Sequence, residues 1–128
     1  MRLLIDTHIL LWAGSQRARV PDSAAQMMDE PENEVFFSSA SIWEIAIKRR
    51  RERDAPVVDA GLFRQNLLTT GYRELEITGL HAAQVQRLPS IHKDPFDRIL
   101  VAQAMVEGLL LLTSDRALAQ YPGPIQKV

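Results

Sequence analysis

Short apolar runs alternate along this chain with longer segments in which apolar residues recur at helical spacing. The short runs predict strands at residues 3–5, 34–37, 72–77, 109–112 and 125–128, with 109–112, the most apolar of them, as the central strand. The longer segments predict helices at residues 9–13, 22–29, 38–53, 59–70, 78–87, 94–107 and 114–120. Gly14 is expected to end the first helix.

Strands that alternate with helices are typical of an α/β fold with a mostly parallel sheet covered by helices on both faces. Continuously apolar strands agree, because a sheet buried on both sides needs no polar face. The 128 residues have the size of one domain, and we expect residues 1–128 to form it.

Composition narrows the possible functions. The 15 Lys and Arg residues nearly balance the 16 Asp and Glu residues, giving a net charge of −1, which excludes nucleic-acid binding by overall charge. There is no cysteine, so thiolate metal sites and cysteine nucleophiles are excluded. No apolar run is long enough for a membrane span or a signal peptide, and a cytoplasmic location is expected.

Four acidic residues are predicted to meet at one edge of the sheet. Asp6 follows the first strand, and Asp115 follows the 109–112 strand. Glu44 and Asp97 lie near the start of helices whose N-termini face the same edge. The carboxyl ends of parallel strands are where α/β proteins form their sites.

Each acid also has a structural explanation. Asp6 could cap the following helix, and Ser41 to Glu44 matches the S-x-x-E capping box. Residues 94–97 form a favourable helix start, with Asp94 as cap and Pro95 in the first position. Asp115 follows a Thr-Ser cap candidate. Capping does not explain the set, because clustered carboxylates repel one another unless a cation intervenes. Oxygen ligands suit Mg²⁺ or Mn²⁺, which favours phosphate chemistry.

Four segments in this order resemble the PIN domain family, most closely the VapC-type toxins of toxin–antitoxin pairs. They are residues 4–8 (LIDTH), 39–48 (SASIWEIAIK), 92–98 (HKDPFDR) and 111–115 (LLTSD). The resemblance covers essentially the whole chain. It implies a three-layer α/β/α fold and an endoribonuclease that requires Mg²⁺ or Mn²⁺ and cleaves RNA with metal-activated water.

The resemblance also implies roles for individual residues. Asp6 and Asp97 would be the principal metal ligands, and Glu44 and Asp115 would complete the acidic site. The residues expected to orient ligands and water are Thr7, Thr113 and Ser114. The implied partners are RNA, a cognate antitoxin protein and a second copy of the chain.

The densest basic run is Lys48, Arg49, Arg50 and Arg51, continuing to residue 53. It could be a solvated helix end or could contact RNA or the antitoxin. Arg98 could contact a phosphate, although an ion pair with Asp97 is the simpler expectation. Apolar side chains between residues 53 and 70 could be core or a dimer or antitoxin surface.

Other aromatic and titratable residues carry weaker signals. His8, His81 and His92 are separated in sequence, and metal-activated water would remove the need for any of them as a general base. Trp12 and Trp43 lie in apolar helical patterns and are predicted to be core residues.

Three other functions are less consistent with the sequence. A phosphatase of the haloacid-dehalogenase kind needs an Asp two residues after the first, where this chain has His8. A receiver-like signalling domain needs paired acids after the first strand, which are absent. A degenerate PIN domain that only binds partners would not need all four acids.

Overall fold

The computed structural model describes residues 1–48 and 58–128 of the chain. The strands are β1 (Arg2–Ile5), β2 (Glu34–Ser38), β3 (Arg73–Leu75), β4 (Leu110–Thr113) and β5 (Ile125–Lys127). The helices are α1 (Thr7–Ser15), α2 (Asp22–Asp29), α3 (Ser39–Lys48), α4 (Ala60–Thr70), α5 (Gly79–Val85) and α6 (Pro95–Glu107), with 3₁₀ turns η1 (Arg17–Arg19) and η2 (Leu118–Gln120). The predicted helix at 114–120 is reduced to η2, and the predicted continuation of α3 to residue 53 lies outside the described residues.

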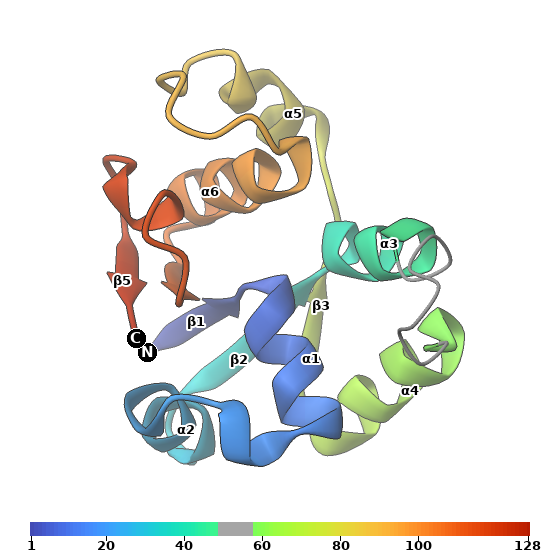
Figure 1. The fold of residues 1–128 in the computed structure, drawn as a ribbon. Helices are drawn as coiled ribbons and strands as arrows, with labels where there is room; N and C mark the ends of the chain where they lie inside the picture. The colour runs from blue at the N-terminus through green and yellow to red at the C-terminus, as the bar shows by residue number, and fades with distance from the viewer. Residues whose placement is uncertain (49–57) are drawn as a thin grey trace.

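All five strands are parallel, in the order β3-β2-β1-β4-β5 (Figure 1). The α/β class and the parallel sheet are therefore as predicted. The prediction that residues 109–112 form the central strand is wrong, because β1 pairs with both β2 and β4. The β4 strand is still interior, since β5 adds beyond it. This explains why β1 and β4 are both almost wholly buried.

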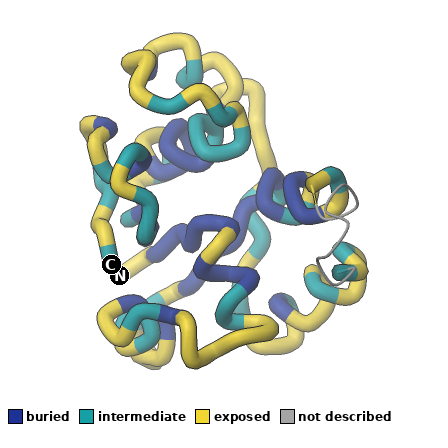
Figure 2. Tube along the Cα trace, viewed as in Figure 1, coloured by how far each residue is buried: buried dark blue, intermediate teal, exposed yellow. Residues whose placement is uncertain are grey.

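Helices cover both faces of the sheet, which gives three layers (Figures 1 and 2). Alternate residues of β1 point to opposite faces: Leu3 and Ile5 pack with α1, α2 and α4, whereas Leu4 packs with α6. All three of these β1 side chains are fully buried. Two cores therefore hold the sheet in place and leave its carboxyl edge to carry polar residues.

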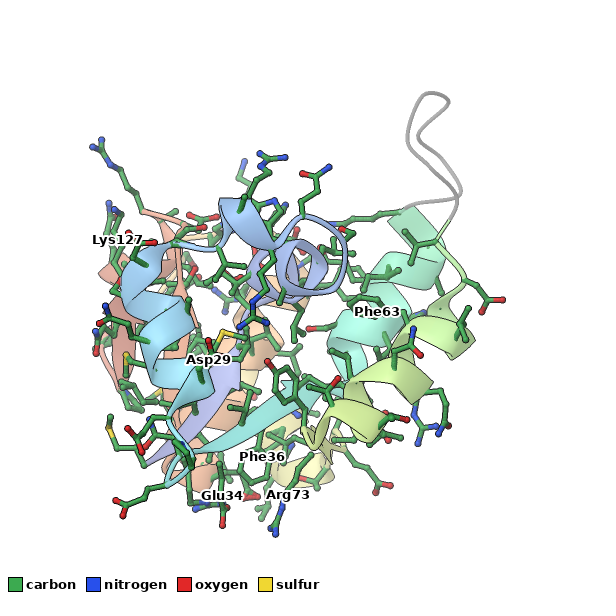
Figure 3. The ribbon with its side chains drawn as sticks, turned by 90° about the horizontal axis from the view of Figure 1, so that it is seen from below. Asp29, Glu34, Phe36, Phe63, Arg73 and Lys127 are labelled. Carbon is green, nitrogen blue, oxygen red and sulfur yellow. The ribbon has the colours of Figure 1, made fainter. Side chains whose placement is uncertain are left out.

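The first helix was predicted to end near Gly14, and α1 ends at the next residue, Ser15. Gly14 also allows close packing against α4, whose Phe63 is labelled in Figure 3. A Cβ atom at Gly14 would lie 2.7 Å from Phe63 Cε2, closer than carbon atoms can approach. Within α4, Leu67 is buried but Leu62 is 60% exposed, so this helix is only partly a core element. No helix in the described ranges is long and apolar enough to cross a membrane.

Candidate active site

Asp6 follows β1 directly and is buried, with 3% of its surface exposed. Its Oδ1 accepts the backbone N–H of Ile9 at 2.9 Å, so the predicted helix cap is confirmed. Its Oδ2 accepts the hydroxyl of Thr113 at 2.5 Å, across from β4. Burial raises the pKa of Asp6, although these hydrogen bonds oppose the rise. The carboxylate is thus held rigidly at the carboxyl edge of the sheet.

Asp97 lies in the first turn of α6, facing the same edge. The helix begins as predicted, with Pro95 in its first turn and Asp94 Oδ1 accepting the N–H of Phe96 at 2.9 Å. Burial, followed by the charges of Asp94 and Glu44, raises the pKa of Asp97 to about 6. A buried carboxyl group beside other carboxylates takes its charged form less readily, which is why its pKa is raised.

Glu44 enters the site from α3, and its predicted capping box with Ser41 is wrong. The helix begins directly after β2, at Ser39, which places Glu44 in its second turn. Ser41, Glu44 and Ile45 form the buried face of α3 at helical spacing. Glu44 Oε2 accepts from Lys48 at 2.8 Å, whereas buried Oε1 has no hydrogen-bond partner within residues 1–48 and 58–128. An unpartnered buried carboxylate oxygen is costly unless a ligand binds it.

Asp115 completes the group from the segment after β4. Its Oδ1 accepts the backbone N–H groups of Ala117 and Leu118 at 2.8 and 3.2 Å, so it caps the following turns. Thr113 joins it to Asp6, because the Thr113 hydroxyl donates to Asp6 and accepts the N–H of Asp115 at 3.0 Å. The structure therefore brings together all four acids that the sequence placed at this edge.

The hydroxyl residues have different partners. Thr7 is buried and donates to Ser41 Oγ at 2.9 Å, which ties α1 to α3. Ser114 contributes its backbone N–H to the Asp6 carboxylate. Only Thr113 contacts an acid of the site through its side chain.

Lys48 makes intramolecular contacts. Its Nζ lies 2.8 Å from both Glu44 Oε2 and Asp94 Oδ2, and 5.3 Å from the centre of the Phe96 ring. Burial opposes its charge, but the hydrogen bonds to Asp94 and Glu44 prevail and raise the pKa of Lys48. The same contact lowers the pKa of Asp94 against the effect of burial. Lys48 thus links α3 to the start of α6, and Arg49, Arg50 and Arg51 lie outside the described residues.

Arg98 does not form the expected ion pair with Asp97. Its guanidinium donates to the backbone oxygens of Val85 and Pro89, at 3.0 and 2.9 Å, and to the Tyr121 hydroxyl at 3.0 Å. These bonds hold the loop between α5 and α6 against the segment after η2. The helical position of Arg98 turns it toward that loop, one residue away from the direction of Asp97.

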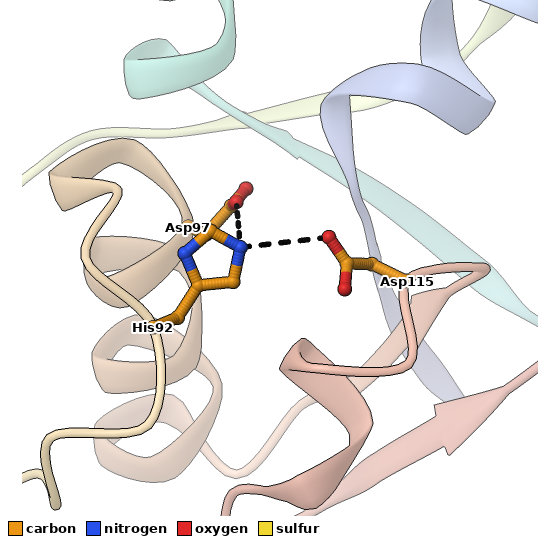
Figure 4. A group of neighbouring side chains, drawn as sticks. All are labelled: His92, Asp97 and Asp115. Carbon is orange, nitrogen blue, oxygen red and sulfur yellow. Dashed lines mark ion pairs between the residues drawn. The ribbon is translucent and has the colours of Figure 1, made fainter.

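His92 is the site residue that sequence reasoning undervalued. It lies on the loop before α6, and its Nε2 is 3.3 Å from Asp97 Oδ2 and 3.6 Å from Asp115 Oδ2 (Figure 4). Among the described residues, these three place one nitrogen and two carboxylate oxygens within 4.8 Å of one another, so the His92 ring lies at the edge of a possible metal site. The sequence signals were its place at the start of the 92–98 segment and its position two residues before the Asp94 cap.

Trp43 was predicted to be a core residue, and this is wrong, because its side chain is 58% exposed. The buried face of α3 is set by Ser41, Glu44 and Ile45, so Trp43 lies outside it. Its ring meets Phe96 edge to face at 5.0 Å, beside an apolar hollow of about 420 Å³ between α3, α5 and α6. Trp12, by contrast, packs against the core as predicted.

The donor set suits a hard divalent cation. Four carboxylates converge here, the pKa values of Asp6 and Asp97 are raised, and Glu44 Oε1 lacks a partner among the described residues. Oxygen donors of this kind fit Mg²⁺ and Mn²⁺. The residues present therefore fit the metal that the sequence predicted.

Comparison with known proteins agrees with the fold. A sequence profile of the PIN domain matches residues 3–124. The chain is similar to ribonuclease VapC22 of Mycobacterium tuberculosis, with 29% identity over 123 residues that cover 95% of this chain and 93% of the relative.

Solved structures have the same fold. VapBC2 of Rickettsia felis, bound to a DNA fragment from its promoter, matches with a TM-score of 0.75 and 13% identity over 100% of this chain and 99% of the other. A toxin–antitoxin complex from Klebsiella pneumoniae matches with a TM-score of 0.66 and 22% identity, covering 97% and 95%. The profile match spans nearly the whole sequence, and the chain belongs to the PIN domain family.

Proposed function

We propose that this chain is an endoribonuclease toxin that depends on Mg²⁺ or Mn²⁺ and is neutralised by an antitoxin protein. The observation that carries the proposal is the position of Asp6, Glu44, Asp97 and Asp115 at one edge of the sheet, with raised pKa values for Asp6 and Asp97 and an unpartnered buried oxygen on Glu44. The similarity to a ribonuclease and the likeness to toxin–antitoxin complexes support the choice of substrate and partner.

The four acids would hold the cation, with Asp6 and Asp97 as its main ligands. The chemistry supplied by such a cation, when bound, is activation of water and neutralisation of charge on the scissile phosphate. Thr113 fixes the Asp6 carboxylate by its hydroxyl, and the N–H groups of α1 and residue 114 restrain the same side chain. Lys48 offsets part of the charge of Glu44 and leaves the other oxygen of that residue available.

The test is cleavage of RNA by the purified chain in Mg²⁺ or Mn²⁺, with the cut ends sequenced. We expect cleavage that a chelator stops and that Asp6→Asn abolishes without unfolding the protein. The matched control is Glu32→Gln, which neutralises an exposed carboxylate in the loop between α2 and β2 and should leave cleavage intact. Cleavage by Asp6→Asn in the presence of chelator would exclude this function. A folded wild-type chain that binds partners without cutting RNA would favour the degenerate PIN domain.

The antitoxin and the second copy of the chain have separate tests. Expression of the chain in bacteria should arrest growth, and co-expression of the small reading frame adjacent to its gene should restore growth. Light scattering of the purified chain should give twice the monomer mass. A toxin that arrests growth but is not relieved by the neighbouring gene product would remove the antitoxin from the proposal.

A further inference from the structure

The loop between α5 and α6 brings the ring of His92 to the edge of the acidic site. Its Nε2 lies 3.3 Å from Asp97 Oδ2 and 3.6 Å from Asp115 Oδ2 (Figure 4). These two carboxylates come from different segments of the chain. The side chain is 22% exposed, so protein surrounds most of the ring. The His92 imidazole therefore lies between the carboxylates of Asp97 and Asp115.

The other ring nitrogen shows where the imidazole carries its proton. The backbone N–H of Asp94 donates to His92 Nδ1 at 3.0 Å. A backbone amide can only donate, so Nδ1 must present its lone pair. The proton of the neutral ring is then on Nε2, and the positive edge of the ring faces Asp97 and Asp115. A protonated Nε2 has no lone pair with which to bind a metal or to take a proton from water.

This orientation is fixed from several sides. The Asp94 side chain is held by Lys48 at 2.8 Å, and its backbone N–H is thereby kept in place. The backbone N–H of His92 donates to the Tyr121 hydroxyl at 2.8 Å, and Arg98 donates to the same oxygen at 3.0 Å. Arg98 and Lys48, which the sequence offered as RNA contacts, therefore both contribute to the placement of this ring.

We propose that His92 is a positioning residue: its Nε2–H edge holds the carboxylates of Asp97 and Asp115 together, so that they are arranged before a cation binds. This inference rests on the proposed function, because it assigns a role within the same metal site. Two carboxylates brought together without such a dipole would repel each other and turn apart. Groups that orient metal ligands in this way typically change metal affinity about 10–100-fold when they are removed.

The first measurement is calorimetric titration of the metal-free chain with Mn²⁺. His92→Leu should weaken Mn²⁺ binding about 10–100-fold, whereas His92→Gln, which can place an amide N–H near the position of Nε2, should restore most of the affinity. Asp29→Asn, which neutralises an exposed carboxylate at the end of α2, is the control and should bind Mn²⁺ like the wild type. Equal affinity in His92→Leu and the wild type would overturn the inference while the proposed function stands.

The second measurement needs no variant and therefore does not depend on whether a variant folds. In ¹⁵N NMR spectra of the wild-type chain, His92 should show a protonated Nε2 and an unprotonated Nδ1, both without metal and with saturating Mg²⁺. Loss of the Nε2 proton when Mg²⁺ is added would make His92 a ligand and would overturn the inference. A wild-type chain that binds neither Mn²⁺ nor Mg²⁺ would instead refute the proposed function, and the metal-free spectrum would still test the tautomer.

RNA cleavage at saturating Mn²⁺ separates positioning from proton transfer. If His92→Leu only weakens Mn²⁺ binding, its rate of RNA cleavage should return to the wild-type rate as the Mn²⁺ concentration is raised. A general base would contribute about 10²–10⁴-fold to the rate even with the site filled. A loss of that size which persists at saturating Mn²⁺ would assign His92 to proton transfer and overturn the inference.

Discussion

Carboxylates on the outer surface of this protein and carboxylates at the carboxyl edge of the sheet have different surroundings. Asp29 at the end of α2 is 60% exposed and accepts two hydrogen bonds from Arg17, and Glu34 lies 3.9 Å from Arg73 near the other end of the sheet (Figure 3). Each of these acids has a guanidinium beside it. Such exposed pairs change stability by only about 0–1 kcal/mol.

Of the acids of the site, Asp6 and Glu44 are buried and Asp97 and Asp115 are half-buried, and the group shares fewer cationic partners. Lys48 serves both Glu44 and Asp94, and His92 lies between Asp97 and Asp115. Burial is the main cause of the raised pKa of Asp97, and the charges of Asp94 and Glu44 add to it. The difference shows that the chain does not lack arginine for pairing its acids, and the proposed function assigns this one group to a cation from solution.

The largest expected effect is on catalysis. Asp97→Asn should lower the rate of RNA cleavage by at least about 10²–10³-fold, because it removes a main ligand. The same variant should melt at a higher temperature than the wild type in chelator, since one repelling charge is gone. Asp29→Asn should change neither quantity appreciably. If Asp97→Asn and Asp29→Asn lost similar amounts of cleavage activity, the acids of the site would not differ in function from those of the outer surface.

Lys48→Met tests the internal link between α3 and α6. It leaves the buried Glu44 carboxylate without its cationic partner, which should reduce the free energy of unfolding by about 1–3 kcal/mol in chelator at neutral pH. Arg17→Met, which breaks the exposed pair with Asp29, should cost no more than about 1 kcal/mol. Chemical denaturation of the two variants measures both values, and equal costs would argue that Lys48 is only a surface charge.

The pH dependence of stability follows from Asp97. Its pKa in the folded chain is about 6, above the model-peptide value of 3.8, so the folded state retains a proton that the unfolded state has already released. Stability in chelator should therefore fall as pH rises from about 4 through about 6. Melting temperatures across this window, with and without Mg²⁺, test the sign. The increase in melting temperature that Mg²⁺ produces should become larger as pH rises. A stability that rises over this window in both Asp97→Asn and the wild type would contradict the prediction.

The smallest effect is expected at the exposed pair of β2 and β3. Arg73→Met should change the free energy of unfolding by less than about 0.5 kcal/mol, because the two charges are 3.9 Å apart and largely solvated. Denaturation of this variant gives the baseline against which the Lys48 result is judged. A cost above 1 kcal/mol would mean that surface pairs matter here as much as the pairs of the site.

The features that depend on hydrophobic periodicity and sheet topology could be predicted from the sequence. The apolar runs of β1 and β4 made the parallel sheet predictable, and its topology placed Asp6, Glu44, Asp97 and Asp115 at one edge. The cap at Asp94 was predictable because capping is local in sequence.

Features that depend on packing between distant segments were not predictable. The position of His92 is set by a loop that Arg98 and Tyr121 hold, and no periodic pattern describes such a loop. Trp43 was placed in the core because its neighbours are apolar, but the buried face of α3 is formed by Ala40, Ser41, Glu44 and Ile45. The close contact of Gly14 with Phe63 was not predictable, because it joins segments 49 residues apart.

Titration of the metal-free chain with Mn²⁺ tests the central claim most directly. The account predicts saturable binding to the wild type, retained in Asp29→Asn and lost or severely weakened in Asp97→Asn. A wild-type chain that takes up no Mn²⁺, or an Asp97→Asn variant that binds it as tightly as the wild type, would contradict the account.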